Sequence, residues 1–163
     1  RSTRKESSAA SDVYKRQIYA YAREELDYWQ SELSRPLASG CFGENLTTQG
    51  VDLSALLINQ RLRIGTAVLE VSVPRQPCST FAGWLGERGW LKRWTARGDC
   101  GTYLRIISPG RIQPGDCITM DAPPNHDITM RIAFAAKMGN RTLAQRVIEA
   151  GCLPPHQNNS LRA

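Results

Sequence analysis

A single cysteine, Cys78, lies where the sequence could place a reactive thiol at the end of a β-strand. It belongs to the segment 74–81, which directly follows a run of alternating apolar residues. Proline cannot donate to a sheet ladder, so Pro74 and Pro77 predict that the strand ends before the cysteine. Arg75 puts a permanent positive charge nearby, and positive charge favours the thiolate, which is the nucleophile and the soft-metal ligand. The alternative interpretation is a buried structural cysteine.

A glycine-flanked loop at residues 40–50 is the second candidate element. Glu44 and Asn45 within it could offer a carboxylate, an amide and exposed backbone N–H groups to a polar ligand. A loop that is ordered by its own turn chemistry would have the same composition. Both interpretations therefore stay open.

Three tryptophans and four basic residues alternate between residues 84 and 97. This composition is typical of surfaces that stack bases and bind phosphates of single-stranded nucleic acid. Tryptophans at helical spacing more often cover a core, with the basic residues on the solvated face. The net charge of +6 adds little support, because residues 1–17 hold five basic and two acidic residues, half of the excess. We therefore favour the core interpretation and expect no nucleic-acid partner.

The only histidines are His126 and His156. A hydrolase that used Cys78 would need one of them as its general base. Asp127 could orient His126, but the same residues also suit the entry to a helix with Asp127 as its cap. We favour the capping interpretation.

The five cysteines are odd in number and contain no C-x-x-C pair, so neither a disulfide framework nor a zinc site is indicated. No apolar stretch approaches the roughly 18 residues that span a bilayer, and no signal pattern opens the chain. We expect a soluble protein of the reducing cytoplasm. With 163 residues, 41% of them hydrophobic, the chain suits one globular domain.

Several short strands are predicted in the middle of the chain. Alternation at 61–64 and 69–73 around Gly65 and Thr66 predicts a β-hairpin. A strand at 102–107, a short return at 111–112 and, after a type II turn at 113–116, a strand at 117–120 follow. Short strands that end in Gly and Pro are typical of a small barrel or sandwich.

Helices are predicted on both sides of these strands. Apolar spacing predicts a helix over 18–33 and an interrupted helix over 81–97, where Phe81 and Leu85, and Trp90 and Trp94, would share one side. Two helices follow at 129–138 and 142–150, the second ending at Gly151. The fold class is therefore α+β, mainly β with flanking helices.

The order and spacing of three segments resemble a MOSC domain, named for the C-terminal region of molybdenum cofactor sulfurases. The segments are Phe-Gly-Glu-Asn-Leu-Thr-Thr at 42–48, Pro-Arg-x-Pro-Cys at 74–78, and Gly-x-Tyr-Leu-Arg at 101–105 followed by Pro-Gly at 109–110 and Gly-Asp at 115–116. The chain is most similar to the stand-alone bacterial YiiM-type subgroup. The resemblance implies a β-barrel with a cleft for a molybdenum–pterin cofactor.

The resemblance also implies the division of the chain. Residues 1–17, which resemble translated adapter sequence, would be a non-native disordered tract standing where family members have further strands. Residues 18–122 would form an incomplete MOSC β-barrel, 123–155 a C-terminal helical extension, and 156–163 a frayed tail.

Site residues follow from the resemblance as well. Cys78 matches the reactive cysteine of the family, which ligates molybdenum in reductases and is thought to carry sulfur in sulfurases. The molybdenum cofactor (molybdopterin) would be bound by six further residues: Arg75, Gly43, Glu44, Asn45, Thr47 and Thr48.

The function expected on this basis is reduction of small N-hydroxylated molecules, with an electron-donor protein as a possible partner. A persulfide carrier or cofactor-delivery module is the first alternative, and a single-stranded nucleic-acid-binding protein is the second.

Overall fold

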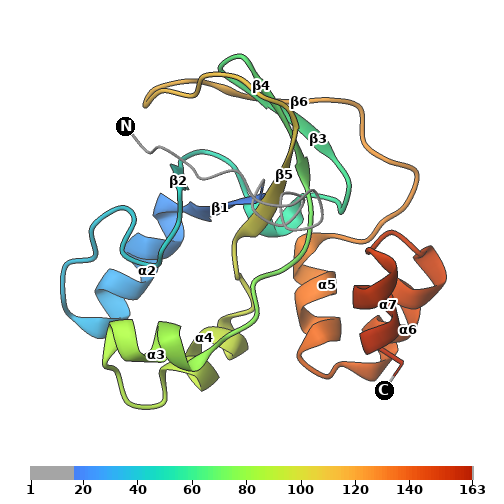
Figure 1. Ribbon diagram of the computed structural model, residues 1–163. Helices are drawn as coiled ribbons and strands as arrows, with labels where there is room; N and C mark the ends of the chain where they lie inside the picture. The colour runs from blue at the N-terminus through green and yellow to red at the C-terminus, as the bar shows by residue number, and fades with distance from the viewer. Residues whose placement is uncertain (1–16, 163) are drawn as a thin grey trace, which may run out of the picture.

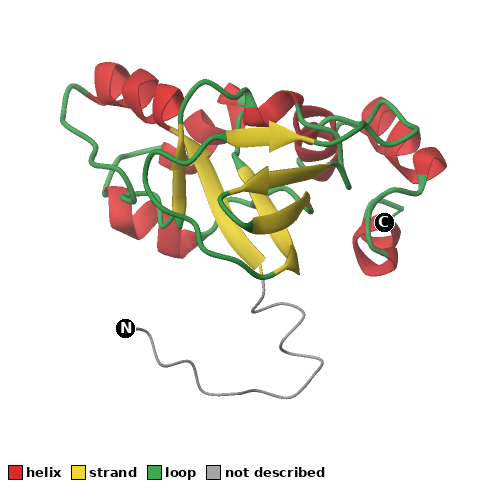
Figure 2. Ribbon diagram, turned by 90° about the horizontal axis from the view of Figure 1, so that it is seen from above, coloured by secondary structure: helices red, strands yellow, loops and turns green. Residues whose placement is uncertain are grey.

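The computed structural model describes residues 17–162, which form one curled six-stranded sheet with helices packed around it (Figure 1). The strand order is β2-β1-β5-β4-β3-β6. The strands are β1 (Gln17–Ala22), β2 (Leu46–Thr48), β3 (Arg61–Ile64), β4 (Ala67–Val71), β5 (Thr102–Ser108) and β6 (Ile118–Met120). Among the strands of residues 17–162, only β1 and β2 pair in parallel. The sheet is a half-barrel, and Figure 2 shows helices at both of its sides.

The first strand corrects the helix expected over 18–33. Residues 18–22 belong to β1, and helix α2 occupies only Arg23–Leu33. Ile18, Tyr19 and Tyr21 are residue types that favour strands, and β1 is held on one side by β2 and on the other by β5. Its last four residues are all buried, so no polar alternation marks the strand in the sequence.

The predicted hairpin is confirmed as β3 and β4, joined at Gly65 and Thr66. The strands at 102–107 and 117–120 are confirmed as β5 and β6. The expected return strand at 111–112 is wrong: Arg111 instead lies against the hairpin turn, where its carbonyl accepts from the N–H of Thr66 and its own N–H donates to the Thr66 hydroxyl. A Cβ on Gly65 would overlap the carbonyl oxygen of Arg111, so this approach requires glycine.

The interrupted helix is confirmed as α3 (Ser79–Leu85) and α4 (Trp90–Arg97). Gly86 and Gly89 have positive φ angles at the break. Phe81, Leu85, Trp90 and Trp94 are all buried, as the spacing predicted. The aromatic rings pack edge to face, with Phe81 contacting both tryptophans. The underside of the half-barrel is therefore closed by an aromatic core.

The C-terminal helices are α5 (Met130–Lys137), α6 (Arg141–Ala150) and α7 (Pro155–Ser160). Helix α6 ends at Gly151 with a positive φ, as predicted. Two expectations need correction. The cap of α5 is Thr129, whose hydroxyl accepts from the N–H of Ile132, and not Asp127. The segment expected to fray from residue 156 forms most of α7, which Pro155 begins in the position that favours proline.

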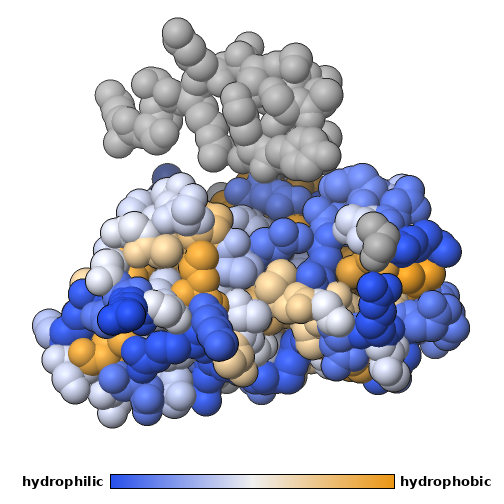
Figure 3. All heavy atoms as spheres, turned by 90° about the horizontal axis from the view of Figure 1, so that it is seen from below, coloured by the Kyte–Doolittle hydropathy of each residue, from blue (hydrophilic) through white to orange (hydrophobic). Residues whose placement is uncertain are grey.

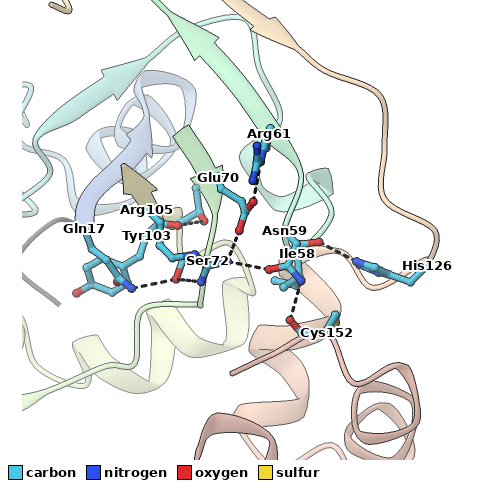
Figure 4. Close-up of polar contacts among 11 residues, drawn as sticks. Gln17, Ile58, Asn59, Arg61, Glu70, Ser72, Tyr103, Arg105, His126 and Cys152 are labelled. Carbon is cyan, nitrogen blue, oxygen red and sulfur yellow. Dashed lines mark hydrogen bonds and ion pairs between the residues drawn. The ribbon is translucent and has the colours of Figure 1, made fainter. Parts of the chain in front are cut away.

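A polar network fastens these helices to the sheet (Figure 4). Arg105 on β5 donates to Glu70 (2.6 Å), Ser72 (3.0 Å) and Asn59 (2.8 Å). The Asn59 amide in turn donates to the carbonyl of Cys152 after α6, at 2.8 Å. Because the network joins residues of the sheet to the segment that follows α6, it holds the helices α5–α7 in place beside the sheet.

None of the helices in residues 17–162 is long and apolar enough to cross a membrane.

Candidate functional site

Cys78 is exposed at the start of α3. Backbone pairing between the strands continues past β4 to Val73, whose carbonyl accepts from the N–H of Tyr103, and it stops at Pro74. The prolines therefore end the strand as predicted, and the backbone of Cys78 is extended (φ −141°, ψ 163°). The buried-cysteine interpretation is wrong for this residue. The thiol lies at the surface, where a ligand or partner can reach it.

Arg75 lies in the interior, with 7% of its surface exposed. Its guanidinium donates to the carbonyl of Phe42 and lies over the rings of Phe81 (4.0 Å) and Tyr19 (4.7 Å). No carboxylate in the described part of the chain pairs with it. In this arrangement the guanidinium joins the loop before β2 to the segment of Cys78. Its contact with a cofactor phosphate stays a prediction.

The buried groups behind Arg75 are held in their neutral forms. The Tyr19 hydroxyl donates to the carbonyl of Cys100. Burial raises the pKa of the Cys100 thiol to about 12 and the pKa of Tyr19 well above its ordinary value. Cys100 is therefore unreactive at neutral pH, whereas Cys78 and Cys117 are exposed.

The loop before β2 is ordered by two of the predicted site residues. The Glu44 carboxylate accepts from the N–H of Phe42 (3.0 Å) and from the hydroxyl of Thr47 (3.2 Å). Asn45 exchanges two hydrogen bonds of 2.8 Å with the backbone of Tyr19. The contacts of these two side chains therefore agree with a loop that is ordered by its own hydrogen bonds.

Gly43 allows this loop to approach the helix that follows Cys78. It has a φ of +82°, and a Cβ there would lie 2.8 Å from the indole of Trp84 on α3. Gly43, Arg75 and Trp84 thus form one contact region next to Cys78, since the Trp84 ring lies 5.9 Å from the guanidinium. Trp84 is 57% exposed, so the core interpretation favoured for the three tryptophans is wrong for this one.

The two predicted threonines line a different space. A cavity of about 830 Å³, here called the edge cavity, lies between the two edge strands of the half-barrel. Asn45, Thr47 and Thr48 line one side, and Cys117 and its neighbours line the other. The hydroxyl of Thr48 is buried without a hydrogen-bond partner among the described residues. The predicted site is thus divided, with Cys78 and Arg75 in one region and the threonines in another.

The remaining candidates have structural contacts. Trp90 and Trp94 are at most 1% exposed, so they cannot stack on bases. His126 accepts from the N–H of Ile128 through Nδ1 (3.0 Å) and donates from Nε2 to the carbonyl of Ile58 (2.7 Å). Both ring nitrogens are therefore occupied, and His126 is not placed to act as a base for Cys78.

The exposed thiol of Cys78 fits a soft metal such as molybdenum. Residues 17–162 contain no group of three or more His, Cys, Asp and Glu side chains that could hold a metal ion. A metal at Cys78 would therefore need the rest of its ligands from an organic cofactor.

Comparison with known proteins agrees with this fold. The family model of the MOSC domain matches residues 8–119, and the chain belongs to that family. The match begins inside the tract expected to be non-native, and residues 1–16 lie outside the described residues. The first residue of β1, Gln17, was also assigned to that tract.

Two relatives and one solved structure are similar to the chain. The uncharacterized protein YflK of Bacillus subtilis is 36% identical over 139 residues, which cover 83% of this chain and 63% of YflK. A protein of Gibberella moniliformis named "Reductase" is 34% identical over 82 residues, 50% of this chain and 15% of that protein. The crystal structure of YiiM from Geobacillus stearothermophilus has a TM-score of 0.78 at 26% identity, covering 89% of this chain and 76% of that one. The chain thus spans less than two thirds of these curated relatives.

Proposed function

We propose that this chain is the MOSC part of a molybdenum-dependent reductase and that Cys78 ligates the metal. The observation that carries the proposal is the exposed thiol of Cys78, held at the end of a proline-ended strand in a MOSC domain. The relative named "Reductase" supports the reaction type. The substrates would be small N-hydroxylated molecules such as base analogues or amidoximes.

The reaction is a two-electron reduction. The N–O bond of the substrate breaks, two electrons and two protons are taken up, and the products are the N–H compound and water. The bound cofactor would supply the two-electron redox chemistry, and an electron-donor protein would restore it. The electrons therefore come from outside this chain.

The residues of the chain itself bind and position. The Cys78 thiolate would hold the metal at the surface. Arg75, through its contacts with Phe42 and Phe81, keeps the cysteine segment against the loop before β2. The exposed indole of Trp84 beside Gly43 offers a planar surface on which a heterocyclic ring could stack.

A sulfur carrier is the second candidate, because the same exposure that suits a metal ligand suits a persulfide. A sulfur-donating persulfide would pass its outer sulfur to Cys78. The Cys78 persulfide would pass that sulfur to an acceptor nucleophile and return to the thiolate, so that no net electrons are needed.

Metal analysis and mass spectrometry separate the two candidates. The chain is purified from a host that makes the molybdenum cofactor, together with the variants Cys78→Ser and Cys117→Ser. The reductase proposal predicts stoichiometric molybdenum in the original chain and in the Cys117 variant, and a strongly reduced molybdenum content in the Cys78 variant. Absence of molybdenum together with a mass increment of one sulfur atom on Cys78 would establish the carrier and end the reductase proposal.

A further inference from the structure

A second cleft lies next to the cysteine segment, on the side of the C-terminal helices. It has a volume of about 370 Å³, and four polar or charged residues contribute to its lining: Gln76, Lys137, Arg141 and Ser160. We call it the basic cleft. Gln76 comes from the segment of Cys78, Lys137 from the end of α5, Arg141 from the start of α6 and Ser160 from the end of α7.

The two cations of the basic cleft have no acidic partner among the described residues. Lys137 donates to the hydroxyl of Ser160 at 2.7 Å, and neither Lys137 nor Arg141 forms an ion pair. By contrast, Arg146 on the same helix pairs with Asp127 at 2.8 Å. The charge of the cleft is therefore available to a ligand.

The surroundings of Lys137 favour an anion. Burial lowers the pKa of its ammonium group, because the group loses water and gains no negative charge in exchange. An anion in the cleft would compensate that loss. Arg141 stands at the first position of a ten-residue helix, whose end carries a partial positive charge.

The underside of the molecule is mostly polar over the described residues. Figure 3 views it from below, where hydrophilic residues predominate and apolar areas are small and separate.

We propose that the basic cleft binds the phosphate group of a small phosphorylated molecule whose remainder extends toward Cys78. A phosphate monoester carries about two negative charges at neutral pH, which matches two cations better than one carboxylate does. Arginine can donate to phosphate through two N–H groups, and lysine binds it as a point charge. The volume lies in the range of small-molecule sites, about 300–1,000 Å³.

The direction toward Cys78 follows from the chain itself. Gln76 lines the cleft and lies two residues before Cys78, so their Cα atoms are at most about 7 Å apart and the cleft is close to the exposed thiol. The link between the bound molecule and chemistry at Cys78 rests on the proposed function, whereas the binding of phosphate does not.

The direct test is titration with inorganic phosphate at constant ionic strength, followed by the amide signals of Gly139 and Gln76 in nuclear magnetic resonance spectra. The double variant Lys137→Gln/Arg141→Gln should bind phosphate at least about tenfold more weakly, since it loses two charge-assisted contacts. The matched variant Arg88→Gln/Lys92→Gln removes the same charge from two exposed positions, one between α3 and α4 and one on α4, and should bind as the original chain does. Equal weakening in both variants, or shifts that do not saturate, would overturn the proposal.

Two further arms separate the proposal from the proposed function. Cys78→Ser should leave phosphate binding unchanged, so a failure of the metal proposal does not remove the site. If the phosphate belongs to the cofactor, the Lys137/Arg141 double variant should lose molybdenum. If it belongs to a substrate, molybdenum should remain and a nucleoside 5′-monophosphate should bind more tightly than inorganic phosphate.

Discussion

Arg75 gives the sharpest test of how the cysteine segment is held. Replacing it by Met keeps an unbranched apolar side chain and removes the guanidinium with its charge. The carbonyl of Phe42 then loses its hydrogen bond from the guanidinium, which costs about 1–3 kcal/mol when the group is buried. The contact with Phe81 at 4.0 Å is lost as well, about 1–2 kcal/mol.

A compensating term reduces this loss. Arg75 is 7% exposed and has no carboxylate partner among the described residues, so the original chain bears a desolvation cost that Met relieves. We expect Arg75→Met to lower the free energy of unfolding by about 2 kcal/mol. Arg75→Lys should lower the free energy of unfolding further, by about 3 kcal/mol relative to the original chain. The reason is that the ammonium group is more strongly hydrated and cannot stack on the rings.

The assay is urea unfolding followed by tryptophan fluorescence, with Arg88→Met as the control at an exposed position, where we expect a change within about 0.5 kcal/mol. The order original, Met, Lys is the prediction. A Lys variant as stable as the original chain would refute the reasoning. It would mean that the charge at position 75 is hydrated and that the planar guanidinium group is not needed.

Three further predictions concern the same end of the molecule. Burial raises the pKa of Asp99 from 3.8 to about 6, so the folded state keeps a proton that the unfolded state has lost, and stability should fall by on the order of 2–3 kcal/mol as the pH rises through that window. Asp99→Asn should abolish this fall in urea unfolding at pH 4 to 7; an unchanged pH profile would contradict the assignment. Gly43→Ala should destabilise the chain by about 1–3 kcal/mol in the same assay, more than Gly40→Ala, which shares the positive φ but has open space around it. Iodoacetamide should modify Cys78 at least about 100-fold faster than Cys100 in peptide mapping, and similar rates would show that the buried thiol is accessible.

Much of the fold could be predicted from local patterns. The hairpin β3–β4, the strand β5 and the break between α3 and α4 carry their signals within a few residues, as alternation or glycine. Strand β1 could not be recognised in this way, because both of its neighbours come from distant parts of the chain and its buried run shows no period.

The candidate site was also predicted only in part, because only some of its residues carry a local signal in the sequence. Cys78 was recognised because two prolines mark the end of its strand, and its exposure agrees with that signal. The surroundings of Arg75 depend on rings from β1 and α3, which no spacing rule brings together. The residues that line the basic cleft come from separate segments between Gln76 and Leu161, so only the folded chain shows their common lining.

The measurement that tests the central claim most directly is X-ray absorption at the molybdenum edge of the cofactor-loaded chain and its Cys78→Ser variant. The account predicts that any molybdenum retained by the variant has one sulfur ligand fewer than in the original chain. An unchanged sulfur shell would show that the thiol of Cys78 does not bind the metal.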